Sequence, residues 1–424
     1  MKIREWDQSL KVRLIGESIM NITFWMFFPF LAIYFAEEFG KGKAGLLLVL
    51  SQVFSVIANL TGGYCADRFG RKRMMVLSSF GQGLSFLLFA FANSPWYESA
   101  LIGFFAFSIA SVFGSLYWPA SQAMVADVVE EKDRSDVFAV FYTSVNIAVV
   151  IGPILGGIFF FSYRFELMMF AALTCFLLSF VLFKWTDETN PEASQSAVSK
   201  DKKWYDVIID QIKDYRVIVR DKIFMLFIIA GILSSQTFMQ LDLLIPVYTK
   251  EVIDAQTIFS LGDWPVSING EKAFGILVSE NGFLVALFTV LISKWVSRFH
   301  EKNVFAVSSI LYAVSMWMFG LTDWFWGFVI AMIVFTLGEL LIVGLQQSFI
   351  SVLAPEHMRG QYFAAASLRY TIGRMIAPAA IPLTIWIGYF WAFFVIALLS
   401  LASAALYYYM FILYGQQKEN TPIQ

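Results

Sequence analysis

Six ionisable side chains that fall inside or beside long apolar runs are the candidates for chemistry in this sequence. An acid or base held at the centre of a membrane costs about 3 kcal/mol or more unless it is paired or hydrated. Residues of this kind therefore bind ions, move protons, or pair with one another to join helices. The six are Glu17, Asp127, Asp242, Glu339, Arg369 and Arg374.

Glu339 is the most deeply placed of the six. Thr336 precedes it by three residues and Gln346 follows it by seven, in runs that are otherwise apolar. On a helix this spacing forms one polar stripe, which would face a cavity. Because burial disfavours the charged form, the carboxyl group can be neutral at rest and release a proton when the cavity opens to water. We expect a functional role for Glu339.

Asp242 stands among Gln236, Gln240 and Pro246 in another apolar run. Its helix would carry polar groups on more than one face. We favour a titrating functional site at Asp242, and the alternative is a structural hydrogen-bonding role.

Glu17 lies about one turn inside the first apolar run, and Asn21 follows four residues later on the same helical face. It is either a functional acid or an interfacial acid near Arg13. Asp127 lies at the end of the fourth run.

Arg369 and Arg374 share one apolar run. Five residues on a helix correspond to about 140°, so their side chains face different directions. The alternatives are a buried ion pair with Glu339 or Asp242 that holds two helices together, and a pair that breaks when the acid is protonated.

The composition identifies the medium around these residues. Hydrophobic residues make up 58% of the chain and charged residues 15%, against roughly 25% charged residues in soluble domains. Too few charges remain to cover a water-exposed surface, so most of the surface is expected to face lipid. A net charge of −2 gives no case for nucleic acid. Two cysteines and two histidines, each pair far apart in the sequence, indicate neither disulfides nor a metal site.

A bilayer core needs about 20 helical residues per crossing. Twelve such spans fit the length, which predicts an all-α polytopic membrane protein. The predicted spans are 14–36, 44–66, 74–93, 97–125, 136–161, 164–185, 223–249, 274–297, 303–322, 324–353, 360–386 and 388–414.

Lys and Arg are concentrated at the N-terminus and in alternate loops, above all between the sixth and seventh spans. By the positive-inside rule, both termini are cytoplasmic and the N-terminal run is a retained span of a cell-membrane protein.

The chain divides at its longest polar stretch. We predict an N-terminal six-helix bundle at 1–185, a cytoplasmic linker with an amphipathic helix at 186–222, and a C-terminal six-helix bundle at 223–424. Similar residues recur at corresponding places in both halves, such as Arg134 with Arg359 and Pro153 with Pro378. This recurrence indicates two pseudo-symmetric bundles.

The segment GGYCADRFGRKR between the second and third spans resembles the loop signature G-x-x-x-D-R-x-G-R-[KR] of the major facilitator superfamily. An aspartate at a helix end can meet an arginine or a helix N-terminus in the other half, and so latch one conformation. The matching residues, proposed as a conformational switch, are Gly63, Asp67, Arg68, Gly70, Arg71 and Lys72.

A second segment, GPILGG, resembles the G-P-x-x-G-G motif of the antiporter branch of that superfamily. Its glycines permit close helix approach and its proline a bend, with or without a mechanistic role. The matching residues are Gly152, Pro153, Gly156 and Gly157, whereas Ala148 departs from the fuller motif.

Along most of its length the chain is similar to LmrP-type multidrug/proton antiporters, on the segments ADRFGRK, MQLDLLIPVY and FTLGEL. The resemblance implies that Asp242 and Glu339 occupy the places of two carboxylates that handle protons and drugs. It also places Asp127 at a carboxylate that ends the fourth span. One functional aspartate of that family is replaced by Phe141, and Glu17 stands where no acid is expected. The coupling carboxylates are then partly relocated.

The resemblance implies proton-coupled efflux of lipophilic, cationic compounds by alternating access. The alternatives are a proton-coupled symporter of a small solute and a lipid flippase on the same fold. We expect membrane lipids and protons as partners, no cofactor, and a monomer. Neither HExxH nor a P-loop motif occurs, which argues against an enzyme or ATP-driven transport. Residues 250–273 predict an extracellular hairpin.

Overall fold

The computed structural model describes residues 4, 6–189, 221–261, 264–353 and 359–420. Their regular structure is helical except for two short β-hairpins. Eleven helical stretches in these ranges are long and apolar enough to cross a membrane. The last covers 53 residues and is interrupted at Gly388, whose φ of 76° is not helical. It therefore provides two crossings, which gives the twelve predicted spans.

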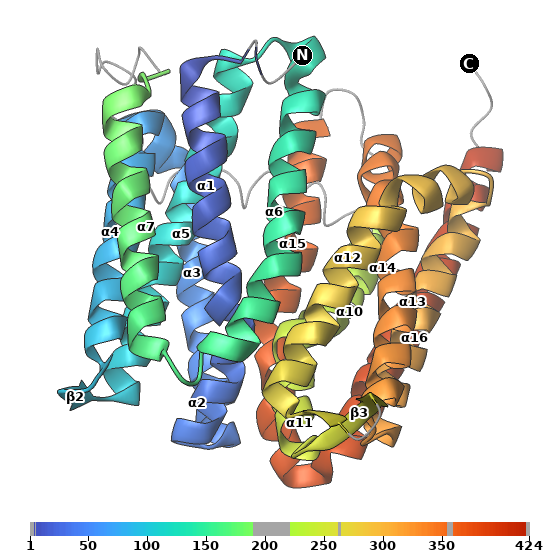
Figure 1. The fold of residues 1–424 in the computed structure, drawn as a ribbon. Coiled ribbons are helices and arrows are strands. Elements are labelled where there is room, and N and C mark those ends of the chain that lie inside the picture. Colours follow the sequence, from blue (N-terminus) through green and yellow to red (C-terminus); the bar gives the residue numbers. More distant parts are fainter. Residues whose placement is uncertain (1–3, 5, 190–220, 262–263, 354–358, 421–424) are drawn as a thin grey trace. The chain divides into compact units, whose positions relative to one another are not determined.

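Contacts divide the chain into two units, Met1–Phe39 with Leu50–Ile208, and Gly40–Val49 with Ile209–Gln424. In unit 1, α1 packs against α6 and α7, and α4 packs against α5 and α7 (Figure 1). The elements from α1 to α7 are α1 (Gln8–Phe27), η2 (Phe28–Phe30), α2 (Leu31–Phe39), α3 (Lys41–Phe69), α4 (Arg71–Phe91), β1 (Asn93–Ser94), β2 (Tyr97–Glu98), α5 (Ala100–Val128), α6 (Glu131–Phe159) and α7 (Arg164–Trp185).

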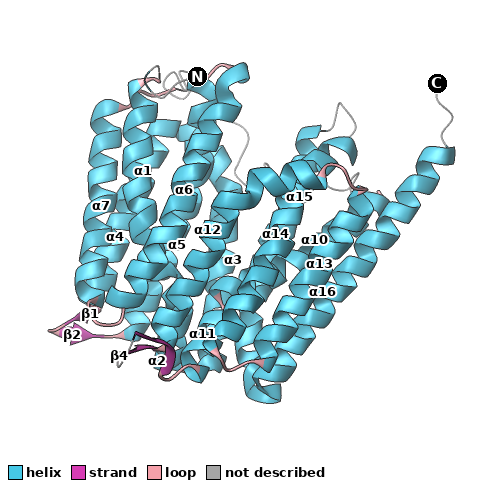
Figure 2. Cartoon of the chain, turned by 45° about the vertical axis from the view of Figure 1, so that its right-hand side comes forward, coloured by secondary structure: helices cyan, strands magenta, loops and turns pink. Residues whose placement is uncertain are grey.

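In unit 2, α13 packs against α14 and α16, while α10 packs against α15 and α16 (Figure 2). A buried aromatic group that includes Phe227, Phe305 and Phe349 fills the space among these helices. The elements are α10 (Lys222–Phe238), η3 (Met239–Asp242), α11 (Leu244–Val252), β3 (Gln256–Leu261), β4 (Trp264–Ile268), α12 (Gly270–Val296), α13 (Glu301–Leu321), α14 (Phe325–Leu353), α15 (Arg359–Ile376), η5 (Ala377–Ala379) and α16 (Ala380–Asn420).

Three spans that we predicted as continuous helices are broken by a 3₁₀ turn, at η2, η3 and η5. Pro29 lies in the first turn and Pro378 in the third, while Pro246 follows the second. A proline lacks the N–H that the helical pattern needs and its ring crowds the preceding turn. Most of the predicted linker at 186–222 lies outside the described residues; of the rest, residues 186–189 are not helical and Lys222 already begins α10.

The hairpin expected within 250–273 is confirmed. β3 and β4 pair antiparallel, from Gln256 opposite Ile268 to Leu261 opposite Trp264. The hairpin is tied to the start of α14, since Phe325 N donates to Gln256 Oε1 at 2.9 Å. Its extracellular location stays a prediction.

Gly152 and Gly156 lie where α6 meets α1. A Cβ atom at Gly156 would come within 2.1 Å of the Met26 carbonyl oxygen, and one at Gly152 within 2.5 Å of the Trp25 Cβ. These glycines therefore set how closely the two helices pack. Pro153 and Gly157 of the same motif are also buried.

Gly156→Ala is expected to destabilise the protein by about 1–3 kcal/mol, since an added methyl group in a filled interface forces helices apart. Gly415→Ala is the matched control, because nothing lies within 4 Å of the added atom there. The melting temperature of the purified protein measures both. Equal melting temperatures for the two variants would refute a packing role for Gly156.

Candidate functional site

Glu339 lies in α14 and is held by a side chain of α12. Asn281 Nδ2 donates to Glu339 Oε2 at 2.9 Å and also contacts Thr336 Oγ1 at 3.0 Å. Asn281 and Thr336 are buried and Glu339 is half-buried. The predicted stripe thus joins Thr336 to Glu339, and its third member, Gln346, accepts from Tyr370 OH at 2.6 Å.

Asp242 ends the 3₁₀ turn η3, between the two helical halves of its span. Leu243 next to it has φ −124° and ψ −76°, outside the helical range. Asp242 Oδ1 is buried and has no hydrogen-bond partner among the described residues. Unwound segments of broken membrane helices form ion-binding sites in transporters, and Asp242 lies in such a segment.

Asp242 lies within electrostatic range of the second carboxylate and of one arginine. Electrostatic interactions connect Asp242 with Glu339, and Asp242 with Arg374. No ion pair within 4 Å joins either acid to Arg374 in the described ranges. The charge of Arg374, whose side chain is exposed, is therefore close enough to influence Asp242 without occupying it.

Among the described residues, Arg369 forms no ion pair with Glu339 or Asp242, the pair on which both of our interpretations depended. It is 2% exposed, donates from Nε to the Ala366 carbonyl at 2.9 Å, and lies over the Phe227 ring with Cζ 4.4 Å from the centroid. Gly231 makes room for it, because a Cβ there would come within 2.2 Å of Arg369 Cδ. Arg369 thus joins α15 to α10 through a cation–π contact.

Glu17 is the centre of a buried polar cluster in unit 1. It accepts hydrogen bonds from Arg13 Nε at 2.9 Å and from Tyr117 OH at 2.7 Å, and Ser121 Oγ lies 3.3 Å away. Arg13 is 1% exposed, and its Cζ lies 5.2 Å from the centroid of the Phe141 ring. The acid expected at position 141 is therefore replaced by a ring that covers the arginine, while Glu17 supplies the negative charge.

Glu17→Gln leaves Arg13 buried without a counter-charge. Because breaking a buried pair from one side costs about 3–5 kcal/mol, we expect a large loss of stability and of folded protein in the membrane. Exchanging Arg13 and Glu17 together for Met and Leu should restore much of it. If Glu17→Gln is as stable as the wild type, Glu17 has no structural role. Its function would then be measured as cation/proton coupling in transport assays.

The loop between α3 and α4 carries a second polar group. Arg71 Nη1 pairs with Asp127 Oδ2, which also accepts from Thr189 Oγ1 at 2.7 Å. Glu188 Oε1 accepts from the backbone N–H of Arg71 at 2.8 Å, at the first turn of α4. A carboxylate at this place satisfies free N–H groups and complements the helix dipole.

Gly70, which precedes α4, has φ 95° and would clash with Glu188 if it carried a Cβ. Of the other motif residues, Arg68 lies over the Phe69 ring and Gly63 has open space around it. Asp67 belongs to α3, but its side chain is outside the described part, so its predicted latch stays a prediction.

Several residues at these sites were not predicted. Glu188 was assigned to the cytoplasmic linker, and Asn281 and Glu280 were not singled out within their apolar span. Glu280 is half-buried in α12, and its Oε2 has no partner among the described residues. The signal was the run Ser279-Glu280-Asn281, three consecutive polar residues within a long apolar stretch.

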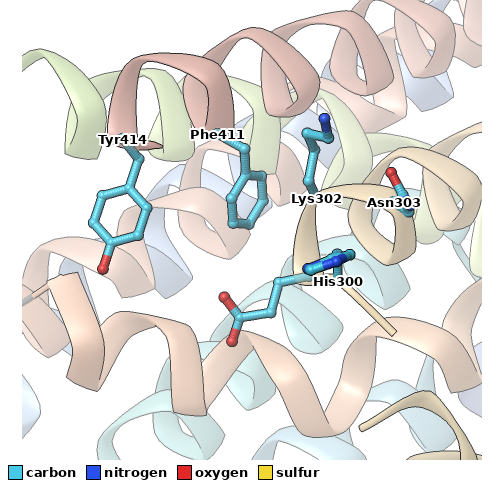
Figure 3. Close-up of a pocket in the computed structure, with 6 residues that line it drawn as sticks. His300, Lys302, Asn303, Phe411 and Tyr414 are labelled. Carbon is cyan, nitrogen blue, oxygen red and sulfur yellow. The ribbon is translucent and has the colours of Figure 1, made fainter. Parts of the chain in front are cut away.

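A pocket of about 390 Å³ lies elsewhere in unit 2, between the start of α13 and the end of α16 (Figure 3). None of the predicted carboxylates lines it. Its lining residues are His300, Glu301, Lys302, Asn303, Phe411 and Tyr414.

Comparisons with known proteins agree with this architecture. The profile described as Major Facilitator Superfamily matches residues 14–264 and 260–423. A Na(+), Li(+), K(+)/H(+) antiporter of Planococcus maritimus is 58% identical over 422 residues, 98% of this chain and 99% of that protein. Multidrug resistance protein MdtH of Escherichia coli is 21% identical over 86% of this chain and 83% of its own. A crystallised transporter of the POT family superimposes with a TM-score of 0.78 at 17% identity, covering 99% of this chain and 98% of that chain, which shows the fold alone.

Proposed function

Because the chain belongs to the Major Facilitator Superfamily and is a secondary transporter with many membrane spans, we propose that it exchanges protons for monovalent alkali cations. The observation that carries this proposal is the 58% identity, along nearly the whole chain, to a protein named as an antiporter for Na⁺, Li⁺ and K⁺ against H⁺. This replaces multidrug efflux as the favoured substrate assignment.

Unit 2 holds groups suited to such an exchange. Asp242 lies at a helix break and Glu339 on a neighbouring polar stripe, and Asp242 acts electrostatically on Glu339. A carboxylate at membrane depth has a low free energy when it is protonated, paired with an arginine, or bound to a cation. A carboxylate can be in only one of these states at a time, so a proton and a cation compete for it. The gradient of one can then drive transport of the other.

Alternating access supplies the direction. Superfamily members expose a central site to one side and then the other through movement of their two halves. Protons entering from the outside would neutralise the carboxylates and displace the cation outward in the exchange. The protein acts as a monomer in the cell membrane, without a cofactor.

The test uses everted membrane vesicles acidified by respiration, with a fluorescent dye that reports the pH gradient. Adding NaCl, LiCl or KCl should collapse the gradient in vesicles that contain the protein, and not in vesicles that lack it. Choline chloride controls for ionic strength. A gradient unaffected by all three cations would reject the proposal.

A second candidate is efflux of lipophilic cations, favoured by the similarity to the multidrug resistance protein MdtH. Ethidium added to the same vesicles separates the two. Proton-driven ethidium uptake that is insensitive to alkali cations would favour this candidate, whereas competition between ethidium and Na⁺ would indicate one shared site.

The orientation is part of the proposal. Both termini should be cytoplasmic, residues 186–222 should be cytoplasmic and residues 250–273 extracellular. A single cysteine placed at Ser267, which is exposed in β4, should react with an impermeant thiol reagent on whole cells. One placed at Ser194 should react only after lysis. The reverse pattern would overturn the assigned orientation.

A further inference from the structure

The turn η3 contains a glutamine whose amide group is oriented by two backbone carbonyls. Gln240 is 0% exposed, and its Nε2 donates to Gln236 O at 3.0 Å and to Ala377 O at 3.2 Å. Carbonyl oxygens only accept hydrogen bonds, so the NH₂ group must face them. Gln240 Oε1 therefore points away, and in the described parts of the chain no group donates to it.

Asp242 adds further oxygen atoms at the same turn. Its Oδ1 is also buried without a donor in the described ranges. Pro246 lacks the N–H that a continuous helix would direct at the Asp242 carbonyl. The same turn thus carries a side-chain amide oxygen and a carboxylate oxygen without donors, and a backbone carbonyl that Pro246 cannot serve.

Buried acceptors without donors cost about 1–3 kcal/mol each, and a turn that holds two of them is expected to serve a ligand. Oxygen atoms of this kind replace the hydration shell of an alkali cation. The turn Met239–Asp242 has a single acid, so one bound positive charge balances it. The carbonyl end of α10 precedes the turn and carries a partial negative charge, which favours a cation further.

We propose that Gln240 Oε1 and the Asp242 carboxylate bind one dehydrated monovalent alkali cation at the break between α10 and α11, with Gln240 setting the preference among Li⁺, Na⁺ and K⁺. The inference rests on the proposed cation/proton exchange and identifies its binding site. Arg374 supplies the alternative positive charge at Asp242.

Gln240 also connects the cation to a second broken span. Its amide nitrogen is held by Ala377 in η5, so the position of its oxygen depends on the break in the neighbouring span. A displacement of η5 relative to η3 releases the amide and removes one cation ligand. The proposed site is therefore complete only while Gln240 in η3 stays in contact with Ala377 in η5.

Gln240→Met tests the site, because methionine has nearly the same length and no oxygen. Loss of one ligand oxygen should raise the Na⁺ concentration for half-maximal exchange about tenfold, equivalent to about 1.4 kcal/mol. The rate at saturating Na⁺ should change much less, and the order of preference among the three cations should change. Gln82→Met is the matched control, a buried glutamine of α4 in unit 1.

Thermal unfolding of purified protein gives a readout independent of transport. Added NaCl, compared with choline chloride, should raise the melting temperature of wild type and of the Gln82 variant, and not that of Gln240→Met. Gln240→Asn keeps the amide group but moves its oxygen back by one methylene, so NaCl should not raise its melting temperature either. This variant replaces Gln240→Met if the methionine variant does not fold.

The two arms separate the two claims. Wild-type exchange combined with unchanged half-saturation and unchanged cation preference in both Gln240 variants would overturn the site and leave the proposed function standing. A wild-type protein with no response to any alkali cation would overturn the proposed function and the site together.

Discussion

Glu339→Gln is expected to abolish exchange driven by a pH gradient. Glutamine keeps the size of the side chain, and its Oε1 can still accept the hydrogen bond from Asn281 that Glu339 receives at 2.9 Å. The fold should therefore be preserved while the group is fixed in a neutral form that cannot exchange a proton. Cation-induced collapse of the pH gradient should fall to the level of vesicles without the protein.

Glu339→Asp should keep partial activity, because a titratable group remains about one methylene short. Glu98→Gln, in an exposed strand of unit 1, is the control that removes one acid far from the helix breaks. Equal melting temperatures would show that the glutamine variant is folded. Full pH-driven exchange by Glu339→Gln would make the residue structural and would refute the coupling scheme.

Asp242→Asn should weaken cation binding by at least about 100-fold. A full charge about 3 Å from a cation contributes about 5 kcal/mol at an effective dielectric constant of 20, and each 1.4 kcal/mol is tenfold in affinity. Asparagine retains an oxygen at the same place, so the shape of the turn is kept. The concentration of Na⁺ required for half-maximal exchange measures the effect.

Asp254→Asn is the matched control, since Asp254 is exposed just beyond α11. In Asp242→Asn, the remaining exchange should also lose its dependence on pH at that site. Wild-type affinity for Na⁺ in Asp242→Asn would exclude this carboxylate as a cation ligand, whatever its effect on the rate.

The span pattern could be predicted from the sequence because hydrophobic runs of bilayer length are a strong signal. The predicted runs 74–93 and 303–322 correspond closely to α4 (Arg71–Phe91) and α13 (Glu301–Leu321). The hairpin within 250–273 also followed from local turn residues. These features depend on composition and short-range chemistry, which one sequence contains.

The helix breaks and side-chain partners could not be predicted in the same way. A proline in the sequence marks where a helix is weakened. It does not determine whether the helix bends or unwinds, and beside Asp242 the helix unwinds. Arg369 was predicted to pair with Glu339 or Asp242, either permanently or as a switch, whereas its guanidinium lies over the Phe227 ring. Such outcomes depend on which helices become neighbours.

The central claim is tested most directly with purified protein in liposomes that contain a pH indicator. Liposomes loaded with Na⁺ are diluted into choline medium, with the membrane-permeant anion thiocyanate at equal concentration on both sides to suppress membrane potentials. Outward Na⁺ movement should drive protons inward, so the lumen acidifies, and reversing the Na⁺ gradient should make it alkaline. A luminal pH that follows neither Na⁺, Li⁺ nor K⁺ gradients, in liposomes shown to hold folded protein, would contradict cation/proton exchange.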